Sequence, residues 1–354
     1  MGFEQLSQTY IRSATLWDIT VPVFGVTNTA PRSGGSGQAL VGNLGERIGT
    51  RTIPGGNYAH LFCGIGWMYR STTLAATPAN LDFTLFDGTT AQIGWVISNL
   101  GEVIVYRGGT TGGTELGRTA TGVIVAAGTS GTGADYKMIE MEVVFATGAT
   151  GSVVIKVADT TVLTVSSVQT AASANAYANR VRLIMRSDNA LTRMDDFYVN
   201  DNTGSAPENT FFGEAFVVEA LVPNADGNSS QWLGSDGNST NNYLLVDDTG
   251  NDDTDYVASG TLNDIDTYNL PSLTNATGTV IGVNLIHVAR KDDVATRTIA
   301  GVLRTASTNY VGSNKTMSGT YTLYEERTLI NANTSLRFTI SDVNGLEIGQ
   351  KLTT

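Results

Sequence analysis

Two glutamates, Glu140 and Glu142, stand two residues apart in an alternating apolar segment and form the acid pair best suited to glycoside cleavage. Side chains at i and i+2 of a strand share one face and lie about 6.6 Å apart, which overlaps the separation of paired catalytic acids. No third acid and no aromatic sugar platform accompanies this pair. We therefore predict that the two glutamates lie on a solvated strand face.

The sequence contains few residues that could serve in nucleophilic catalysis. The chain contains two histidines, His60 and His287, and one cysteine, Cys63. A Ser-His-Asp or Cys-His site needs a histidine beside the nucleophile. Cys63 and His287 stand within apolar segments, so buried structural roles are predicted for both. We predict no catalytic residue, no cofactor and no enzymatic activity, and a single cysteine cannot form an intrachain disulfide.

Several aspartates offer the hard oxygen ligands that Ca²⁺ prefers. None of their segments matches the Asp-x-Asp-x-Asp-Gly loop of an EF-hand, and Asx turns explain the two Asp-Gly-Asn segments equally well. A structural Ca²⁺ ion is therefore the alternative to local turn bonding. The candidate metal ligands are Asp195, Asp196, Asp226, Asp236, Asp247 and Asp248.

Residues 136–145 give the clearest strand pattern. Ile139, Met141 and Val143 fall on one face and the two glutamates fall on the other, so the apolar set is expected to face a core. Residues 60–69 predict a strand whose glycines mark the close approach of another backbone. Further strands are predicted at residues 81–88, 91–98, 103–107, 152–157, 160–165, 213–222, 280–290, 296–304, 320–324 and 336–340.

The segment from residue 180 to residue 199 predicts a boundary. Residues 180–186 and 194–199 are expected to form two neighbouring strands that close the first domain, before a polar bend at residues 200–204. The charge distribution changes at the same place. Residues before Ser205 include 13 basic and 15 acidic side chains, whereas the remainder includes 8 basic and 18 acidic ones.

Composition favours a two-domain, all-β protein. A chain of 354 residues exceeds what one core usually supports, and 40 glycines with 7 prolines suit short strands joined by tight turns. A formal charge of −12 argues against nucleic-acid binding, which needs clustered lysine and arginine. We find no apolar run of about 18 residues that would span a membrane. Residues 1–10 lack the pattern of a secretory signal, so we expect a protein made in a cytoplasm.

The order of segments 136–143, 153–157, 161–163, 181–183 and 194–199 resembles the concanavalin A-like, laminin-G-type jelly roll over residues 30–200. In that family the last strand often carries an Asp-Asp-aromatic element, which Asp195, Asp196 and Phe197 match here. The resemblance implies an antiparallel sandwich. Glucanases of such jelly rolls carry a Glu-x-Asp-x-Glu or related run, and here Val143 and Val144 follow Glu142, so the third carboxylate is missing.

Residues 211–223, 226–232, 242–248, 282–293 and 343–349 resemble structural proteins of tailed bacteriophages. That resemblance implies a virion component with other virion proteins as partners. It leaves open whether the component belongs to the head or to the tail.

Together these observations predict two antiparallel β-sandwich, jelly-roll-like domains in tandem. We expect an N-terminal arm or first strand at residues 1–29, a jelly roll at 30–200, a linker at 201–207 and an acidic C-terminal β-sandwich at 208–354. We expect a non-enzymatic virion protein that serves as a capsid decoration, a head fibre or a tail appendage subunit. Such a subunit is expected to form homo-oligomers and to bind a host-surface glycan. The alternative is a free carbohydrate-binding module or a glycoside-active jelly roll.

Overall fold

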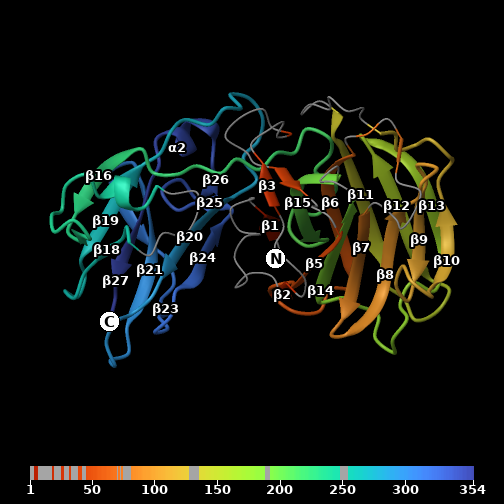
Figure 1. Ribbon diagram of the computed structural model, residues 1–354, viewed down its shortest axis with the longest axis horizontal. Coiled ribbons are helices and arrows are strands. Elements are labelled where there is room, and N and C mark those ends of the chain that lie inside the picture. Colours follow the sequence, from red (N-terminus) through yellow and green to blue (C-terminus); the bar gives the residue numbers. More distant parts are fainter. Residues whose placement is uncertain are drawn as a thin grey trace. The chain divides into compact units, whose positions relative to one another are not determined.

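The computed structural model describes residues 4–6, 18–19, 25–27, 32, 39–41, 45–69, 71, 73–74, 81–126, 135–187, 192–247 and 254–354. The chain divides into two compact units, Met1–Glu219 and Ala220–Thr354 (Figure 1). Each unit consists of antiparallel strands, so the predicted all-β fold class is confirmed.

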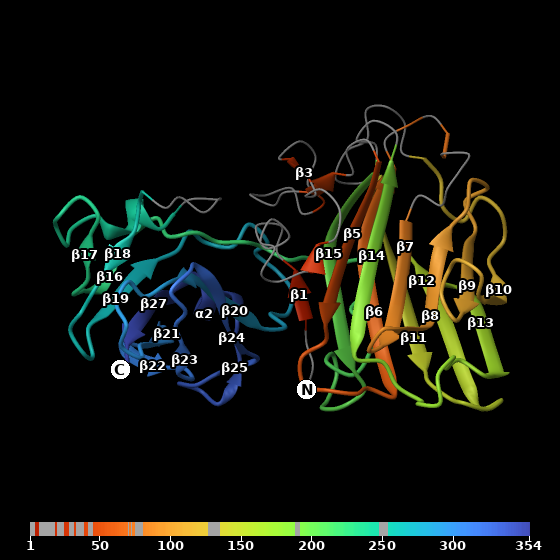
Figure 2. The same cartoon turned by 60° about the horizontal axis from the view of Figure 1, so that its bottom comes forward.

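Unit 1 is a sandwich of two antiparallel sheets, which Figure 2 shows as two facing layers. Sheet A has the order β13 (Thr160–Val168), β12 (Gly151–Val157), β11 (Lys137–Val144), β6 (His60–Tyr69), β15 (Thr192–Asp201), β4 (Ala39–Val41) and β3 (Gly25–Thr27), and β1 (Glu4–Leu6) also pairs with β15. Sheet B has the order β10 (Thr114–Arg118), β9 (Val103–Arg107), β8 (Thr90–Ile97), β7 (Leu81–Asp87), β14 (Arg180–Ser187), β5 (Gly45–Thr52) and β2 (Asp18–Ile19).

The core of unit 1 lies between the two sheets. It includes Trp67 of sheet A and Trp95 of sheet B, each 1% exposed. The alternation of β11 is confirmed, because Ile139, Met141 and Val143 all lie in this core at 0% exposure. Burial of such a continuous apolar layer is the main source of stability for a sandwich.

The two strands expected to be neighbours at the end of unit 1 are not neighbours. β14 pairs with β5 and β7 in sheet B, whereas β15 pairs with β1, β4 and β6 in sheet A. The chain passes from one sheet to the other between them, as in a sandwich whose successive strands alternate layers. The prediction failed because strand propensity does not say which partner each strand takes.

The glycines of β6 allow close packing on its outer face. A Cβ atom on Gly64 would lie 2.1 Å from Cε1 of Tyr198, so the tyrosine ring rests directly on the strand. At Gly66 a Cβ atom would lie 3.0 Å from the carbonyl oxygen of Asp195 and 2.8 Å from Cδ of Arg32. The expected close approach of backbone therefore holds at Gly66, while at Gly64 a side chain fills the space.

Unit 2 contains a six-stranded antiparallel sheet and several two-stranded ones. The larger sheet has the order β16 (Ala225–Ser230), β19 (Ile265–Asn269), β27 (Glu347–Leu352), β21 (Thr298–Thr305) and β22 (Thr308–Val311), and β23 (Lys315–Thr316) also pairs with β21. The two-stranded sheets are β20 (Val283–Ala289) with β24 (Thr322–Thr328), β17 (Leu233–Gly234) with β18 (Val257–Ala258), and β25 (Ile330–Asn331) with β26 (Leu336–Arg337). The β20–β24 ribbon packs on the larger sheet, since a Cβ atom on Gly301 of β21 would lie 3.0 Å from Leu285 of β20.

Two strand predictions around unit 2 are wrong. Residues 213–222 form no strand, and residues 336–340 give only the short β26 before helix α2 (Ile340–Asn344) begins. That helix starts at a capping box, in which Thr339 and Asp342 satisfy each other's backbone amides. The central strand β27 was not predicted. Within the described residues, no helix combines the length and apolar character needed to span a membrane.

Candidate functional site

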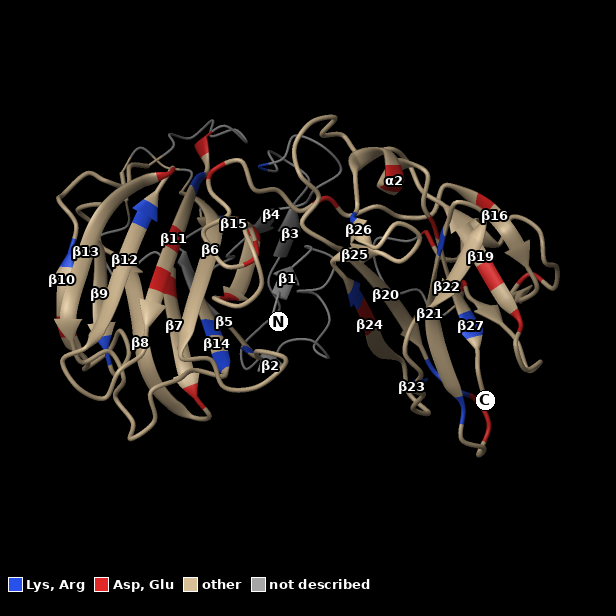
Figure 3. Ribbon diagram, turned by 180° about the vertical axis from the view of Figure 1, so that it is seen from behind, with Lys and Arg blue, Asp and Glu red and all other residues tan. Residues whose placement is uncertain are grey.

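The predicted acid pair does not lie on a solvated face. Glu140 is 0% exposed, and its Oε1 accepts hydrogen bonds from the Tyr198 hydroxyl at 2.5 Å and from the Gly213 amide at 2.8 Å. Glu142 is partly exposed and its Oε1 lies 2.9 Å from Nε2 of His60. The acidic segment of β11 is visible in Figure 3. The two glutamates therefore have different environments, although they share one strand face.

The face was predicted to be solvated because alternation cannot reveal what covers it. Residues 211–218 return across β6, β11 and β15, and three phenylalanines of this segment pack there. The Phe211 ring lies 5.3 Å from that of Phe62, and the rings of Phe212 and Phe216 lie 4.3 Å and 5.2 Å from that of Tyr198. This covering segment was itself predicted to be a strand of the second domain.

Burial controls the chemistry of Glu140. It raises the pKa of the carboxyl group, and the hydrogen bonds from Tyr198 and Gly213 oppose that shift. The Tyr198 hydroxyl also has its pKa raised, first by burial and then by the charge of Glu140. Because Glu140 is sealed beneath residues 211–218, it cannot contact a saccharide in this conformation.

The candidate metal ligands Asp195 and Asp196 also bond to this covering region. Asp195 accepts from the Arg32 and Asp196 amides, and Asp196 accepts from the Arg32 guanidinium at 2.7 Å and from the Val218 amide at 2.8 Å. Burial and the adjacent charge of Asp195 raise the pKa of Asp196 to about 7, against the opposing effect of Arg32. All four carboxylate oxygens accept from N–H donors, which is an environment unlike a Ca²⁺ site.

The remaining metal candidates belong to unit 2. Asp226 accepts from the amides of Asn241 and Tyr243, and Asp236 accepts from Asn238 in an Asx turn. Asp247 is half-buried just beyond the 3-10 turn Asn242–Leu245, and Asp248 lies outside the described residues. No group of three or more metal-ligating side chains occurs among the residues described.

The residues considered for nucleophilic catalysis are separated. Cys63 is 2% exposed, and burial raises the pKa of its thiol. His287 belongs to unit 2, where its Nε2–H donates to the Gly349 carbonyl at 2.9 Å and burial lowers its pKa. Cys63 is buried as predicted, whereas His287 is half-buried.

A more open polar site lies where three connections of unit 1 meet. We call it the loop-end site: Asn57 between β5 and β6, Asp87 and Gly88 at the β7–β8 turn, and residues 172–179 between β13 and β14. Asn179 joins the connections, because its Nδ2 donates to Asn57 at 2.9 Å and its Oδ1 accepts from the Gly88 amide at 2.9 Å. The strands ending here belong to both sheets, so the sandwich itself brings these loops together.

Gln92 holds the loop-end site in place. This side chain is 0% exposed, and its Oε1 accepts from the amides of Ala172 and Ser173 at 2.6 Å and 2.9 Å. Its Nε2 lies 2.8 Å from the Ser173 hydroxyl and 2.9 Å and 3.0 Å from the carbonyls of Asn175 and Tyr177. One buried amide thus fixes the course of residues 172–177.

The loop-end site retains polar atoms without a partner. Oδ2 of Asp87 accepts from the Ser173 hydroxyl at 2.9 Å and from Nδ2 of Asn175 at 2.8 Å. As far as the structure describes the chain, Oδ1 of Asp87, Nδ2 of Asn57 and the hydroxyl of Tyr177 form no hydrogen bond. Asn57 is exposed, and Asp87 and Tyr177 are half-buried. These donors and acceptors can therefore bind a ligand at a surface whose backbone is already ordered.

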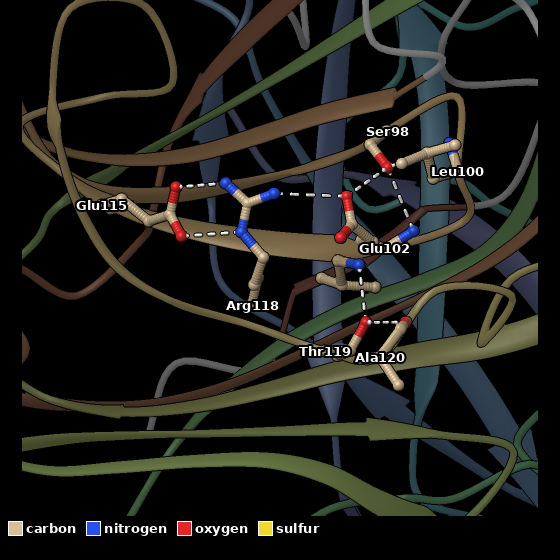
Figure 4. Close-up of polar contacts among 8 residues, drawn as sticks. Ser98, Leu100, Glu102, Glu115, Arg118, Thr119 and Ala120 are labelled. Atoms are coloured by element: carbon tan, nitrogen blue, oxygen red, sulfur yellow. Dashed lines mark hydrogen bonds and ion pairs between the residues drawn. The ribbon is translucent and has the colours of Figure 1, made fainter.

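A second polar cluster of unit 1 is internally neutralised. Arg118 donates to Glu115 at 2.6 Å and 2.8 Å and to Glu102 at 3.3 Å, while Ser98 orders the β8–β9 turn through Glu102 (Figure 4). The Arg118 guanidinium lowers the pKa of the Glu115 carboxyl. This cluster stabilises a turn, and its charged groups pair with one another, unlike those of the loop-end site.

Sequence reasoning missed the loop-end site. Its members are asparagine, serine and aspartate in short connections, which is also the composition of ordinary turns. The signal that could have identified it is Gln92, a polar residue within an apolar strand segment. A buried amide needs several partners, so it indicates a loop folded over it.

No protein-family model matches this chain. No curated protein matches it by sequence. Among solved structures it is similar to the carbohydrate binding module CBM66 from Bacillus subtilis, with 10% identity, 52% of this chain and 92% of that chain covered, and a TM-score of 0.32. It is similar to the endo-beta-1,4-glucuronan lyase from the fungus Trichoderma reesei, with 12% identity, 58% and 96% covered, and a TM-score of 0.38.

A third similar structure is a carbohydrate esterase from the Shiga toxin-encoding bacteriophage phi24B, with 12% identity, 52% of this chain and 89% of that chain covered, and a TM-score of 0.34. All three TM-scores lie below 0.5.

Proposed function

We propose that this chain is a non-catalytic structural protein of a tailed-phage particle that binds a host-surface glycan through the loop-end site. The observation that carries the binding role is the set of unpartnered donors and acceptors on Asn57, Asp87 and Tyr177, held by the buried Gln92. Sugar hydroxyls both donate and accept hydrogen bonds, so carboxylate and amide groups are suitable partners for them. The half-buried Tyr177 ring adds an apolar surface with a polar tip.

A preformed loop favours binding because little conformational entropy is lost when a ligand arrives. Residues 172–177 are fixed by Gln92 before any ligand contacts them. The binding role is also compatible with a protein that performs no chemistry, since hydroxyl recognition needs no acid–base pair.

The structural role rests on the sequence resemblance to virion proteins and on the burial of Glu140. That glutamate bonds to Tyr198 and Gly213, so the acid pair considered for glycoside cleavage serves to hold residues 211–218 on unit 1. As a capsid decoration, head fibre or tail appendage, the subunit would contact other virion proteins and form homo-oligomers. The alternative is a free carbohydrate-binding or glycoside-active protein.

Binding is tested with the full chain on a glycan array, followed by calorimetry with the strongest ligand. Asp87→Ala should weaken binding about tenfold, as expected for loss of a charged hydrogen-bond acceptor, whereas Glu115→Gln at the remote cluster should leave it unchanged. Equal affinity of Asp87→Ala and the parent chain would contradict the proposed site.

The particle role is tested separately. Antibody labelling of purified phage particles should place the chain on the particle surface, and its absence from particles would refute the virion assignment. Reducing-sugar release measured in parallel tests the alternative. Release that disappears in Glu140→Gln would refute the non-catalytic role.

A further inference from the structure

Arg182 of β14 lies on the outer face of sheet B, and no carboxylate of the described residues pairs with it. Its guanidinium carbon lies 4.9 Å from the centre of the Phe86 ring. Its Nε is buried and has no hydrogen-bond partner, and within the described part of the chain Arg182 forms no ion pair. The side chain is half-buried, so the rest of its guanidinium can meet an acidic ligand from outside the protein.

An acid on the neighbouring strand β7, Asp82, is already bonded. Asp82 is 1% exposed, and its two oxygens accept from the hydroxyls of Thr84 and Thr110. Asp82 stands opposite Ile184 in the sheet, while Arg182 stands opposite Thr84. Asp82 therefore does not neutralise Arg182, and the positive charge is left for another anion.

The Arg182 side chain leans toward the loop-end site. Although its cross-strand neighbour is Thr84, its guanidinium lies over Phe86, two residues nearer the end of β7. Asp87 of the loop-end site follows Phe86 directly, and the Asn179 amide donates to the Phe86 carbonyl at 2.8 Å. Phe86 therefore connects the cation with the loop-end site, because its ring lies under Arg182 and its carbonyl accepts from Asn179.

We infer that the glycan bound at the loop-end site is acidic, and that Arg182 binds the carboxylate of a uronic or sialic acid residue. This inference rests on the proposed glycan-binding function. A planar guanidinium presents paired N–H donors that match a carboxylate, and its position over an aromatic ring keeps it ordered. Charge complementarity also selects against neutral glycans, because they leave the guanidinium of Arg182 without a carboxylate partner.

The test uses the full chain and an array on which each uronic-acid or sialylated oligosaccharide is printed beside its carboxyl methyl ester. The ester keeps every ring and hydroxyl and removes only the charge. We expect the parent chain to prefer the carboxylate form about tenfold, as for a charge-assisted hydrogen bond, and to lose this preference at high salt. Comparison of uronate with sialate spots identifies the source of the carboxylate.

Two variants locate the effect. Arg182→Gln should remove the preference while leaving the affinity for the methyl ester unchanged, which also shows that the variant is folded. Arg182→Lys should retain part of it, because lysine keeps the charge without the planar donor pair. Arg118→Gln is the matched control, since that guanidinium is engaged by Glu115 and Glu102, and it should retain the full preference.

The outcomes separate the two proposals. If esters and carboxylates bind equally well, or if Arg182→Gln keeps the preference, the acidic-glycan inference is wrong and the binding site stands. If no saccharide of either form binds, the proposed function fails and this inference fails with it.

Discussion

Replacing Gln92 with leucine should loosen the loop-end site without disturbing the sheets. Leucine has a volume similar to that of glutamine. Position 92 lies within β8 and is 0% exposed, so the space of the native side chain accommodates the apolar one. The substitution removes the two acceptor bonds to the amides of Ala172 and Ser173 and the donor contacts to Ser173, Asn175 and Tyr177. Residues 172–177 then lose their main attachment.

The magnitude follows from these contacts. The amide of Gln92 accepts two hydrogen bonds and has two N–H groups to donate, so at about 1 kcal/mol net for each bond the upper value is about 4 kcal/mol. Residues 172 and 175 are exposed, so part of that loss is recovered when water reaches the freed backbone groups. We therefore expect the free energy of unfolding of unit 1 to fall by about 2–4 kcal/mol.

Two measurements check this expectation. Urea denaturation reports the loss of stability, and hydrogen exchange reports the amides of Ala172 and Ser173, whose protection should fall most. Glycan affinity should fall about tenfold if the loop is ordered in one molecule of ten, because only the ordered fraction binds.

Gln169→Leu is the matched control on the same connection. Gln169 is half-buried and makes two contacts, with Arg107 at 2.5 Å and with the Ala171 carbonyl at 3.0 Å. Its replacement should cost less than about 1 kcal/mol, since both groups lie near water. If Gln92→Leu costs no more than this control, or leaves the two amides protected, Gln92 does not organise the site.

Three further outcomes test the covering segment and the core. Gly64→Ala should destabilise unit 1 by about 2 kcal/mol in urea denaturation, because the new methyl group displaces the Tyr198 ring, whereas Gly148→Ala, with nothing within 4 Å, should be neutral. For Asp196 the folded pKa is about 7, above the ordinary value near 3.9, so the folded state binds the extra proton and stability falls as pH rises from about 4 to 7. Asp196→Asn should flatten that slope in denaturation curves, and an unchanged slope would contradict it. Cys63 should resist a thiol reagent at pH 8 in the native protein and react in denaturant, because burial raises its pKa.

The sandwich of unit 1 could be predicted because its strands alternate strictly. β11 places Ile139, Met141 and Val143 in the core as the period of two requires, and β9 begins and ends at the expected residues. The pairing of β14 and β15 could not be predicted in the same way. Both strands have apolar sequences and follow each other in the chain. Their pairing partners, however, depend on the three-dimensional arrangement of all the strands.

The face of β11 that carries Glu140 shows a different limit. Periodicity states which side chains leave the core, and it does not state whether water or protein meets them. The signal for this burial is the presence of three aromatic rings within six residues, at Phe211, Phe212 and Phe216. Such rings need an apolar surface to pack against. Because residues 213–222 were predicted as a strand of the second domain, the burial of Glu140 beneath residues 211–218 was not expected.

Glu140 and Asp87 show how the environment of a carboxylate separates a structural acid from a binding one. Each has one oxygen that accepts two hydrogen bonds and one oxygen without a partner among the described residues. At Glu140 the free oxygen is sealed from water, so burial raises the pKa and favours the neutral acid. At the half-buried Asp87 the free oxygen belongs to a surface that water reaches. A hydroxyl ligand can replace that water, so the same chemical group supports the fold in one place and can recognise a ligand in the other.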